Sequence, residues 1–377
     1  MLDFHHLSQL NKGINFIPDI RGFTDFVSKV EVSHSQHIVS ELLELIIDEI
    51  QGDFLVSEIE GDAVLSYRFD ENIDIEKLVA LCENIFVKFH SHLKNYSKNR
   101  ICQCGSCSTA DQLGLKFIFH IGKFGLHKIS DREKLYGKEV ILAHRLLKND
   151  FPFSEYILLS SSDQKVEHAA FESFEKAVEG FGIHQLYIFN LAPFKDNIPD
   201  PPKRTMKYIP EIDSMIFESI SDTPFQEIIL AITEPEQRIR WMKNVTKIKL
   251  KGHKINRINS DHECIINGNS MEVTLEEMVS NDHEVKIIEH AVMRSPRLEM
   301  FQLFTITRIT DNKIIIGMGT SLIPGKNPIV NFLKPLIEWY FSNQNATKLR
   351  GLSDYIRQMN ELGTSLDPQF SKQMNVF

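Results

Sequence analysis

The sequence predicts an α+β fold in two domains, and three observations support this. In the first half, amphipathic stretches with a helical period alternate with short strand-like stretches. A proline-rich segment then interrupts the pattern. Beyond it, β-rich stretches follow one another until one long helical segment. The 377 residues are enough for two or three domains of ordinary size.

Composition narrows the class of protein. A hydrophobic content of 42% and a charged content of 25% are typical of soluble globular proteins. The net charge of −9 argues against a nucleic-acid binder, which normally has a basic face. No run approaches the roughly 18 apolar residues of a membrane span, and the N-terminus lacks an apolar signal core. Five cysteines do not make a disulfide scaffold. We therefore expect a cytoplasmic protein with no membrane span and no nucleic-acid partner.

The first half is expected to form helices and strands around an antiparallel sheet. Helical periodicity is present at 37–50, 75–93 and 138–149. Strand patterns are present at 53–69, as a hairpin turning at residues 60–62, at 114–129, as a strand, a Gly-Lys turn and a strand, and at 156–161. This mixture predicts an α+β sandwich of ferredoxin-like character.

The second half has a different pattern. Residues 196–210 hold four prolines, which stiffen an extended chain and mark a linker. Five β-rich stretches follow, and then a long helix with a kink expected near Pro335. A curved antiparallel sheet closed over this helix would leave a cavity. Aromatic side chains that could line or fill it are Phe301, Phe304, Trp339 and Tyr340.

Two acids lie where a strand pattern meets a turn. Asp19 stands in "FIPDIRGFT" and Asp62 in the turn of the hairpin at 53–69. If the two strands are neighbours, both carboxylates converge at one edge, and carboxylates suit Mg²⁺ or Mn²⁺. The turn Gly22-Phe23-Thr24 opens a helix and offers N–H groups to a polyphosphate. The alternative is that Asp19 simply ends a strand and caps the next helix. The metal interpretation fails if the oxygens point apart or are locked to basic neighbours.

The order of these motifs resembles the class III nucleotidyl cyclase catalytic domain. "FIPDIRGFTDF", a helix, "EIEGDAVL", "FHIGKFG" and "LYGKEVILAHRLL" carry the resemblance, which covers residues 14–195. It implies that Asp19 and Asp62 bind two metal ions together with the carbonyl of Ile20. It also implies that Gly22, Phe23 and Thr24 approach the phosphates of a nucleoside triphosphate, and that the protein is a homodimer.

The same resemblance assigns base recognition to two positions. The residue three before the hairpin glycine is Lys in adenylyl and Glu in guanylyl cyclases, and here it is Glu58. Its family partner, an Asp or Cys, is replaced by Lys134. Opposite charges in one pocket would either read a base or pair with each other and close the site.

Two further positions concern the transition state. The family places an Asn four residues after Gly137 to orient the ribose, and an Arg four residues further on to stabilise the α-phosphate. Here these positions hold Ile141 and Arg145. Isoleucine can neither donate nor accept a hydrogen bond, and losing one such contact typically costs about 10²–10³ in rate.

A cysteine cluster precedes the predicted strand at 114–129. Cys102, Cys104 and Cys107 could supply three thiolates to Zn²⁺. A redox-active loop or plain surface thiols are the alternatives, because no second pair of ligands is visible further along the chain.

Residues 213–362 resemble a START-like helix-grip domain through strand order and the closing helix. Members of that family usually bind hydrophobic ligands. The expected domains are therefore a cyclase-like domain at 14–195, a linker at 196–212 and a START-like domain at 213–362, with tails at 1–13 and 363–377. Two functions stay open: a nucleotide cyclase coupled to a hydrophobic-ligand domain, and a catalytically inactive sensor or scaffold that binds nucleotide, metal or lipid.

Overall fold

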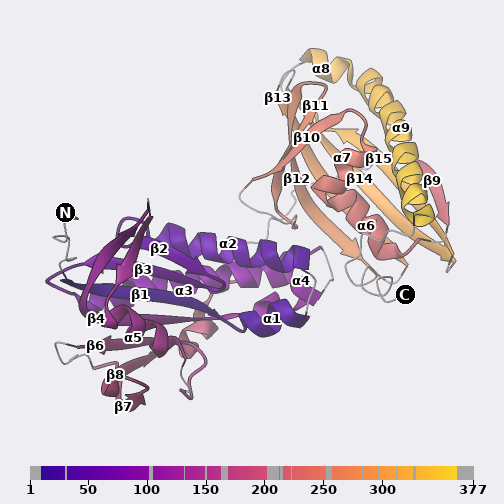
Figure 1. The fold of residues 1–377 in the computed structure, drawn as a ribbon. Helices are drawn as coiled ribbons and strands as arrows, with labels where there is room; N and C mark the ends of the chain where they lie inside the picture. The colour runs from indigo at the N-terminus through magenta and orange to yellow at the C-terminus, as the bar shows by residue number, and fades with distance from the viewer. Residues whose placement is uncertain are drawn as a thin grey trace. The chain divides into compact units, whose positions relative to one another are not determined.

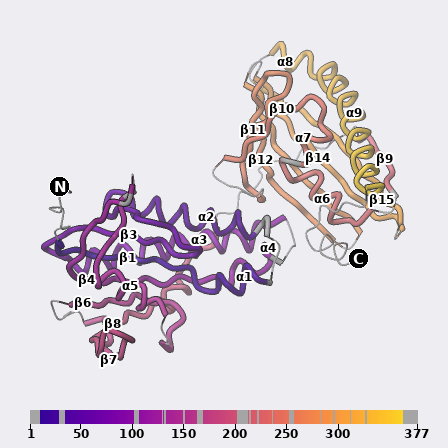
Figure 2. The backbone as a smooth tube through the Cα atoms, viewed as in Figure 1, coloured from indigo at the N-terminus to yellow at the C-terminus, as the bar shows by residue number. Residues whose placement is uncertain are grey.

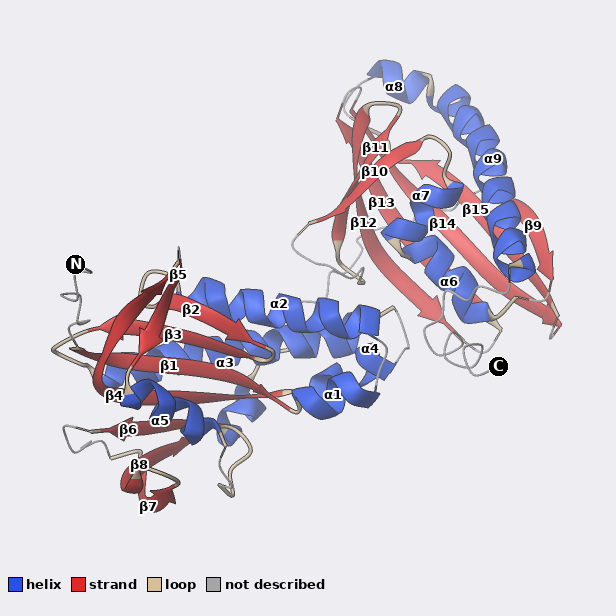
Figure 3. Ribbon diagram, in the orientation of Figure 1, coloured by secondary structure: helices blue, strands red, loops and turns tan. Residues whose placement is uncertain are grey.

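The structure is a computed structural model in which the chain forms two compact units (Figure 1). The first unit comprises Met1–Ser97 and Thr109–Pro201, and the second comprises Lys98–Ser108 and Pro202–Phe377. Both units contain helices and a large sheet, as the sequence predicts (Figure 3). The residues that the structure describes are 10–29, 32–101, 105–130, 132–148, 151–162, 169–201, 212, 215–221, 223–251, 257–281, 283–294, 297–310, 312–325 and 328–362.

The sheet of the first unit is built on a ferredoxin-like core. Strand order in this sheet is β2-β3-β1-β4-β6-β8-β7, and β5 pairs with β4. The elements up to Pro201 are β1 (Asn11–Arg21), α1 (Phe23–Lys29), α2 (Val32–Ile50), β2 (Leu55–Glu60), β3 (Ala63–Phe69), α3 (Ile75–Asn99), α4 (Gly105–Thr109), β4 (Gly114–Ile129), β5 (Arg132–Tyr136), α5 (Lys138–Leu147), β6 (Tyr156–Ser161), β7 (Glu172–Val178) and β8 (Gly182–Asn190). The neighbours β4-β1-β3-β2 are antiparallel throughout, which is the order of a βαββαβ unit.

The centre of this sheet is covered on both faces. Residues 13–20 of β1 are buried in an unbroken run, which a strand shows only when both faces are packed. Ile17 and Ile118 pack with Leu142 and Leu146 of α5 on one face. Successive strand residues alternate in direction, so Phe16 and its neighbours point to the other face. Asp19 therefore points to the α5 face, as Ile17 does.

One expected turn is absent from the first unit. The segment 114–129 is one continuous strand, β4, and not two strands joined at Gly122-Lys123. Gly122 lies opposite Gly13 in the β1–β4 register, and a side chain at this position would meet Glu139 of α5 at 2.8 Å. The glycine thus makes room for α5 on the sheet and does not mark a turn.

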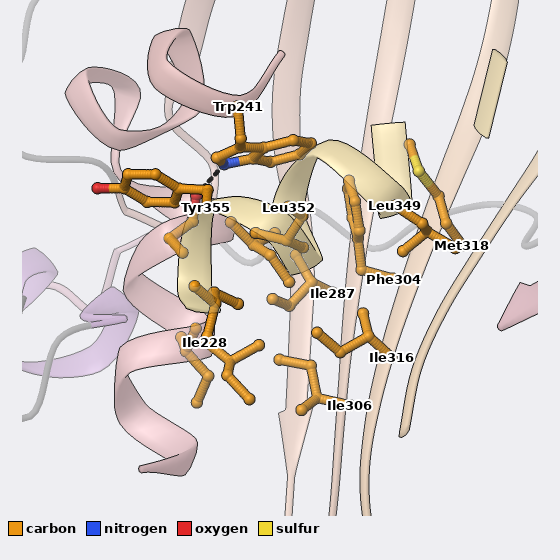
Figure 4. Packing of buried hydrophobic residues seen from close by; sticks show 14 of the residues in the cluster. Ile228, Trp241, Ile287, Phe304, Ile306, Ile316, Met318, Leu349, Leu352 and Tyr355 are labelled. Atoms are coloured by element: carbon orange, nitrogen blue, oxygen red, sulfur yellow. Dashed lines mark hydrogen bonds between the residues drawn. The ribbon is translucent and has the colours of Figure 1, made fainter. Parts of the chain in front are cut away.

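The second unit is a seven-stranded antiparallel sheet with helices packed on it (Figure 2). Strand order is β10-β11-β12-β13-β14-β15-β9. The elements are β9 (Met215–Ser221), α6 (Phe225–Thr233), α7 (Pro235–Trp241), β10 (Val245–Leu250), β11 (Asp261–Ile266), β12 (Asn269–Ser280), β13 (Glu284–Arg294), β14 (Arg297–Thr310), β15 (Lys313–Leu322), α8 (Pro328–Phe332) and α9 (Lys334–Glu361). Buried apolar side chains of α6, α7, α9 and the sheet form one hydrophobic core (Figure 4).

Trp241 fixes α7 within this core. Its indole Nε1 donates a 2.7 Å hydrogen bond to the carbonyl of Ala231 in α6. Gly351 of α9 lies so close that a Cβ there would be 2.6 Å from the carbonyl oxygen of Trp241. Close packing at these two residues holds α9 against α7.

The expected kink in the C-terminal helix is instead a break. α8 ends at Phe332 and α9 begins at Lys334, so Pro335 lies in the first turn of α9. A first-turn N–H has no intrahelical acceptor, and its absence in proline costs nothing there. Within the described residues, no helix is both long and apolar enough to cross a membrane.

Candidate functional site

The two predicted acids meet at the end of β1. Asp19 lies opposite Ala63 in the β1–β3 register, which brings the β2–β3 turn and Asp62 alongside. The N–H of Ile20 donates to the carbonyl of Asp62 at 3.0 Å and fixes the turn against β1. The two side chains lie close enough for the charge of Asp19 to act on Asp62.

This convergence perturbs Asp62. Burial raises the pKa of Asp62 to about 6, and the charge of Asp19 adds to the effect. A like charge beside a carboxylate disfavours its ionised form, so Asp62 loses its proton at a higher pH than an ordinary aspartate does. The position of both acids therefore agrees with the geometry expected from the motif order.

A lysine that the sequence did not single out also reaches this point. Lys116 is the direct β4 partner of Asp19, and its Nζ lies 2.8 Å from Asp19 Oδ2. The ammonium also donates to the carbonyl of Leu147 at the end of α5, at 3.1 Å. The side chains of Lys116 and Asp19 are only 18% and 12% exposed. Both strands, β1 and β4, were predicted from the sequence, but their pairing was not. Only the register of this pair places Lys116 opposite Asp19.

The residues as they lie do not fit a pair of metal ions. Two carboxylates and the carbonyl of Ile20 are hard oxygen donors of the kind Mg²⁺ prefers. However, the ammonium of Lys116 already neutralises Asp19. Among the residues that the structure describes, no three His, Cys, Asp or Glu side chains group as metal ligands. The convergence of the two acids agrees with the metal interpretation, whereas the ion pair between Asp19 and Lys116 opposes it.

The glycine turn lies beside the acids. Gly22 has φ +84° and Gly61 has φ +66°, both in the left-handed region that favours glycine. A Cβ on Gly61 would lie 3.8 Å from the ring of Phe23, so the two turns face each other. Phe23 and Thr24 form the first turn of α1, where backbone N–H groups lack intrahelical acceptors.

The predicted base-recognition residues pair with each other. Lys134 Nζ lies 3.2 Å from Glu58 Oε2, joining β5 to β2. Their side chains are 54% and 32% exposed. The ion pair engages one oxygen of Glu58 and leaves both side chains partly open to solvent.

Helix α5 carries Ile141 and Arg145, the two positions that the resemblance assigns to the transition state. The Nη1 of Arg145 lies 3.0 Å from Glu179 Oε2, and its guanidinium stands over the ring of Phe181. Ile141 is 55% exposed, so an apolar side chain projects from the helix where the family has an amide. His144, three positions further along the helix, has Nδ1 3.6 Å from Glu60 Oε2 beside the β2–β3 turn.

A buried polar group anchors α5 to the sheet. His120 Nε2 lies 2.6 Å from Glu139 Oε2, and the hydroxyl of Ser162 donates to the same oxygen at 2.7 Å. The hydrogen bond from His120 is the main cause that lowers the pKa of Glu139 to about 2. His120 is fully buried, so this group serves packing and not substrate chemistry.

The cysteine cluster is only partly described. Cys102 and Cys104 lie outside the described residues, so the expected Zn²⁺ site concerns positions that carry no structural account. Cys107 is buried, with only 2% of its surface exposed.

The second unit contains a cavity of about 190 Å³. Of the four aromatics expected to line it, Tyr340 does so. The other three are not among the described lining residues. Phe304 fills the hydrophobic core, which is the other role expected of these aromatics; the ring centroid of Phe301 lies 5.1 Å from that of His290, and Trp339 is 64% exposed. Helix periodicity alone could not tell which face of α9 turns inward. Trp241, on α7, lines the cavity and was missed.

Comparisons with known proteins concern mainly the first unit. Residues 39–156 match the model of a family described as "Protein of unknown function (DUF2652)". The uncharacterized protein Rv2561/Rv2562 of Mycobacterium tuberculosis (strain ATCC 25618 / H37Rv) is 32% identical over 125 residues. That match covers 32% of this chain, and the chain spans 57% of the length of this relative.

Solved structures of nucleotide cyclases are similar over about half of the chain. The adenylyl cyclase CyaB from P. aeruginosa is 18% identical with a TM-score of 0.34, covering 48% of this chain and 96% of that one. The guanylate cyclase domain of RhGC from Catenaria anguillulae, in complex with GTP, is 18% identical with a TM-score of 0.35, covering 47% and 95%.

Proposed function

We propose that the chain is a cyclase-like signalling protein whose first unit has kept the architecture of a class III cyclase domain and lost its turnover. The observation that carries this proposal is the ammonium of Lys116, 2.8 Å from Asp19 and in contact with the end of α5. A lysine supplies the positive charge that a metal ion would otherwise bring to these acids. The acid pair is then a structural junction between β1, β4 and α5.

Two further features support loss of turnover. Glu58 and Lys134 pair with each other at the expected base-recognition position, so a base would have to compete with Lys134 for Glu58 Oε2. Ile141 supplies an apolar side chain where a ribose-orienting amide is expected, and removing such a contact costs roughly 10²–10³ in rate. Each of the three parts of the expected site is thus changed in the direction of inactivity.

The proposed organisation has a cyclase-like domain at 14–195, a linker at 196–212 and a START-like helix-grip domain at 213–362. The long helix α9, packed against β15 and β9 of an antiparallel sheet, supports the helix-grip assignment. A cavity between α9 and this sheet supports a role in binding a hydrophobic ligand. We propose a cytoplasmic homodimer in which ligand binding changes dimer geometry.

One observation favours the alternative of a slow cyclase. Asp19 and Asp62 do converge, beside a glycine turn that opens α1, and a scaffold alone has no evident need for both acids. In that case a divalent ion would have to displace Lys116 before a nucleoside triphosphate could react.

Product analysis separates the two functions. Purified protein is incubated with Mn²⁺ and each of the four ribonucleoside triphosphates, and products are resolved by chromatography and mass spectrometry. The proposal predicts no cyclic nucleotide above the level of the Asp19→Ala variant. A cyclic product from the unmodified protein that disappears in Asp19→Ala would establish the enzyme instead.

A further inference from the structure

A lysine side chain reaches the cavity of the second unit from α9. Lys348 lines this cavity together with Trp241, Met300 and Tyr340. With the part of the chain that the structure describes, its ammonium makes no hydrogen bond or ion pair; only charge interactions at longer range act on it. A cation in such a place is costly unless something pairs with it.

The buried groups next to Lys348 do not balance its charge. Arg238 Nη2 lies 2.8 Å from Glu289 Oε2, and the two side chains are 3% and 2% exposed. This pair is neutral as a whole. Glu289 Oε2 is engaged by Arg238, while Glu289 Oε1 has no hydrogen-bond partner among the described groups and acts on Lys348 only through its charge. Burial, and then the charge of Arg238, lowers the pKa of Lys348 to about 8, which leaves most of the ammonium charged at pH 7.

The remaining titratable neighbours are uncharged. Arg238 Nη1 lies 3.2 Å from His262 Nε2, and a guanidinium can only donate, so Nε2 carries the lone pair. Burial lowers the pKa of His262 to about 4, and burial raises the pKa of the Cys264 thiol to about 11. The cluster of Arg238, Glu289, His262, Cys264 and Lys348 therefore holds two cations and one anion.

The rest of the cavity wall is largely apolar. Side chains from α7, β12, β13, β14 and α9 contribute to it, among them Trp241, Met271, Ala291, Met300 and Phe341. An apolar ligand would bury this wall but leave the ammonium unpaired. A ligand with an anionic head group would satisfy both the wall and the excess charge.

We propose that the cavity of the second unit binds a small amphipathic carboxylate, with its carboxylate on Lys348 and its apolar tail against Trp241 and Met300. This rests on the proposed ligand-binding function and names the chemical class of its ligand. An apolar cavity of about 150 Å³ accepts benzene. In proportion, the 190 Å³ here suits about eight heavy atoms, as in a chain of about eight carbons.

Three eight-carbon probes test the head group: octanoate, 1-octanol and octylamine. The chain has two tryptophans, Trp241 in the cavity wall and Trp339, which is 64% exposed. In full-length Trp339→Phe protein, emission therefore reports on Trp241 alone. We expect octanoate to bind at least tenfold more tightly than 1-octanol, and octylamine to bind most weakly.

Substitutions in the same background locate the head group. Lys348→Met keeps an unbranched side chain without charge, and should weaken octanoate binding about 10- to 100-fold. Binding of 1-octanol should change less than about twofold, which shows that the cavity is intact. Arg350→Met removes an exposed cation two residues along α9 and should change neither affinity.

The outcomes separate the two levels of the proposal. Equal binding of octanoate and 1-octanol, or unchanged octanoate binding in Lys348→Met, overturns the carboxylate inference and leaves a hydrophobic-ligand cavity. Loss of octanoate binding in Lys243→Met, at the exposed rim, but not in Lys348→Met would also overturn it. If none of the three probes binds, the proposed ligand-binding function itself fails.

Discussion

Replacing Lys116 tests whether its ammonium holds the acid pair. At 2.8 Å, two unit charges attract by about 6 kcal/mol at an effective dielectric constant of about 20. Desolvation opposes this attraction, and removing one partner of a buried pair costs about 3–5 kcal/mol. Because the side chains are 18% and 12% exposed, we expect Lys116→Met to lower the free energy of unfolding by about 3 kcal/mol.

The same substitution should create affinity for a divalent ion. In the unmodified protein, Mn²⁺ must displace the ammonium from Asp19 before it can bind. If displacing the ammonium costs about 3 kcal/mol of free energy, the affinity for Mn²⁺ is lower by roughly 100-fold. Calorimetric titration with Mn²⁺ should therefore show Lys116→Met binding about 100-fold more tightly than the unmodified protein, and Mn²⁺ should restore part of the lost stability.

Two variants control this experiment. Lys116→Arg keeps the cation and should behave as the unmodified protein does, whereas Lys123→Met removes an exposed lysine of the same strand and should change neither quantity. The reasoning is refuted if Lys116→Met unfolds at the same urea concentration as the unmodified protein and binds Mn²⁺ no better. Adding Asp19→Asn to Lys116→Met should abolish the gained affinity.

Three further predictions concern stability. Glu139 has its pKa lowered from 4.5 to about 2, so it contributes stability above pH 4.5 that is lost as the pH falls towards 2. Urea unfolding should show this group accounting for on the order of 2 kcal/mol between pH 7 and pH 3, a loss that is missing in Glu139→Gln; identical acid slopes would contradict this. Gly351→Ala would ordinarily stabilise a helix by about 1 kcal/mol, but the 2.6 Å contact with Trp241 should reverse the sign and cost about 1–3 kcal/mol, as thermal unfolding would show. Glu58→Gln breaks an ion pair that is 32% and 54% exposed, so a change above about 1 kcal/mol in urea unfolding would mean that this pair does more than surface pairs do.

Local patterns in the sequence predicted the elements better than their ends. The amphipathic period at 37–50 and the hairpin at 53–69 correspond to α2 and to β2 with β3. The turn predicted at Gly122 is wrong because a glycine in a strand can mark either a turn or a close contact. Only the packing of Glu139 against this position decides between the two. Pro335 misled for a similar reason, since its effect depends on where the helix starts.

The candidate site was predictable in its acids and not in its cation. Asp19 and Asp62 could be named because each stands near a strand end, with Gly22 three residues after Asp19 and Gly61 directly before Asp62. Lys116 could not, because its role follows from the register in which β4 pairs with β1. Lys348 was equally hidden, since its position on α9 acquires meaning only when the cavity and the Arg238–Glu289 pair lie beside it.

The most direct test of the central claim is whether Mn²⁺ enters the acid pair of the unmodified protein. Crystals soaked in Mn²⁺ with a non-hydrolysable nucleoside triphosphate analogue can be measured at a wavelength where manganese scatters anomalously. The account predicts no anomalous peak between Asp19 and Asp62, with the ammonium of Lys116 still on Asp19. A manganese peak bridging the two carboxylates, with Lys116 displaced, would contradict it.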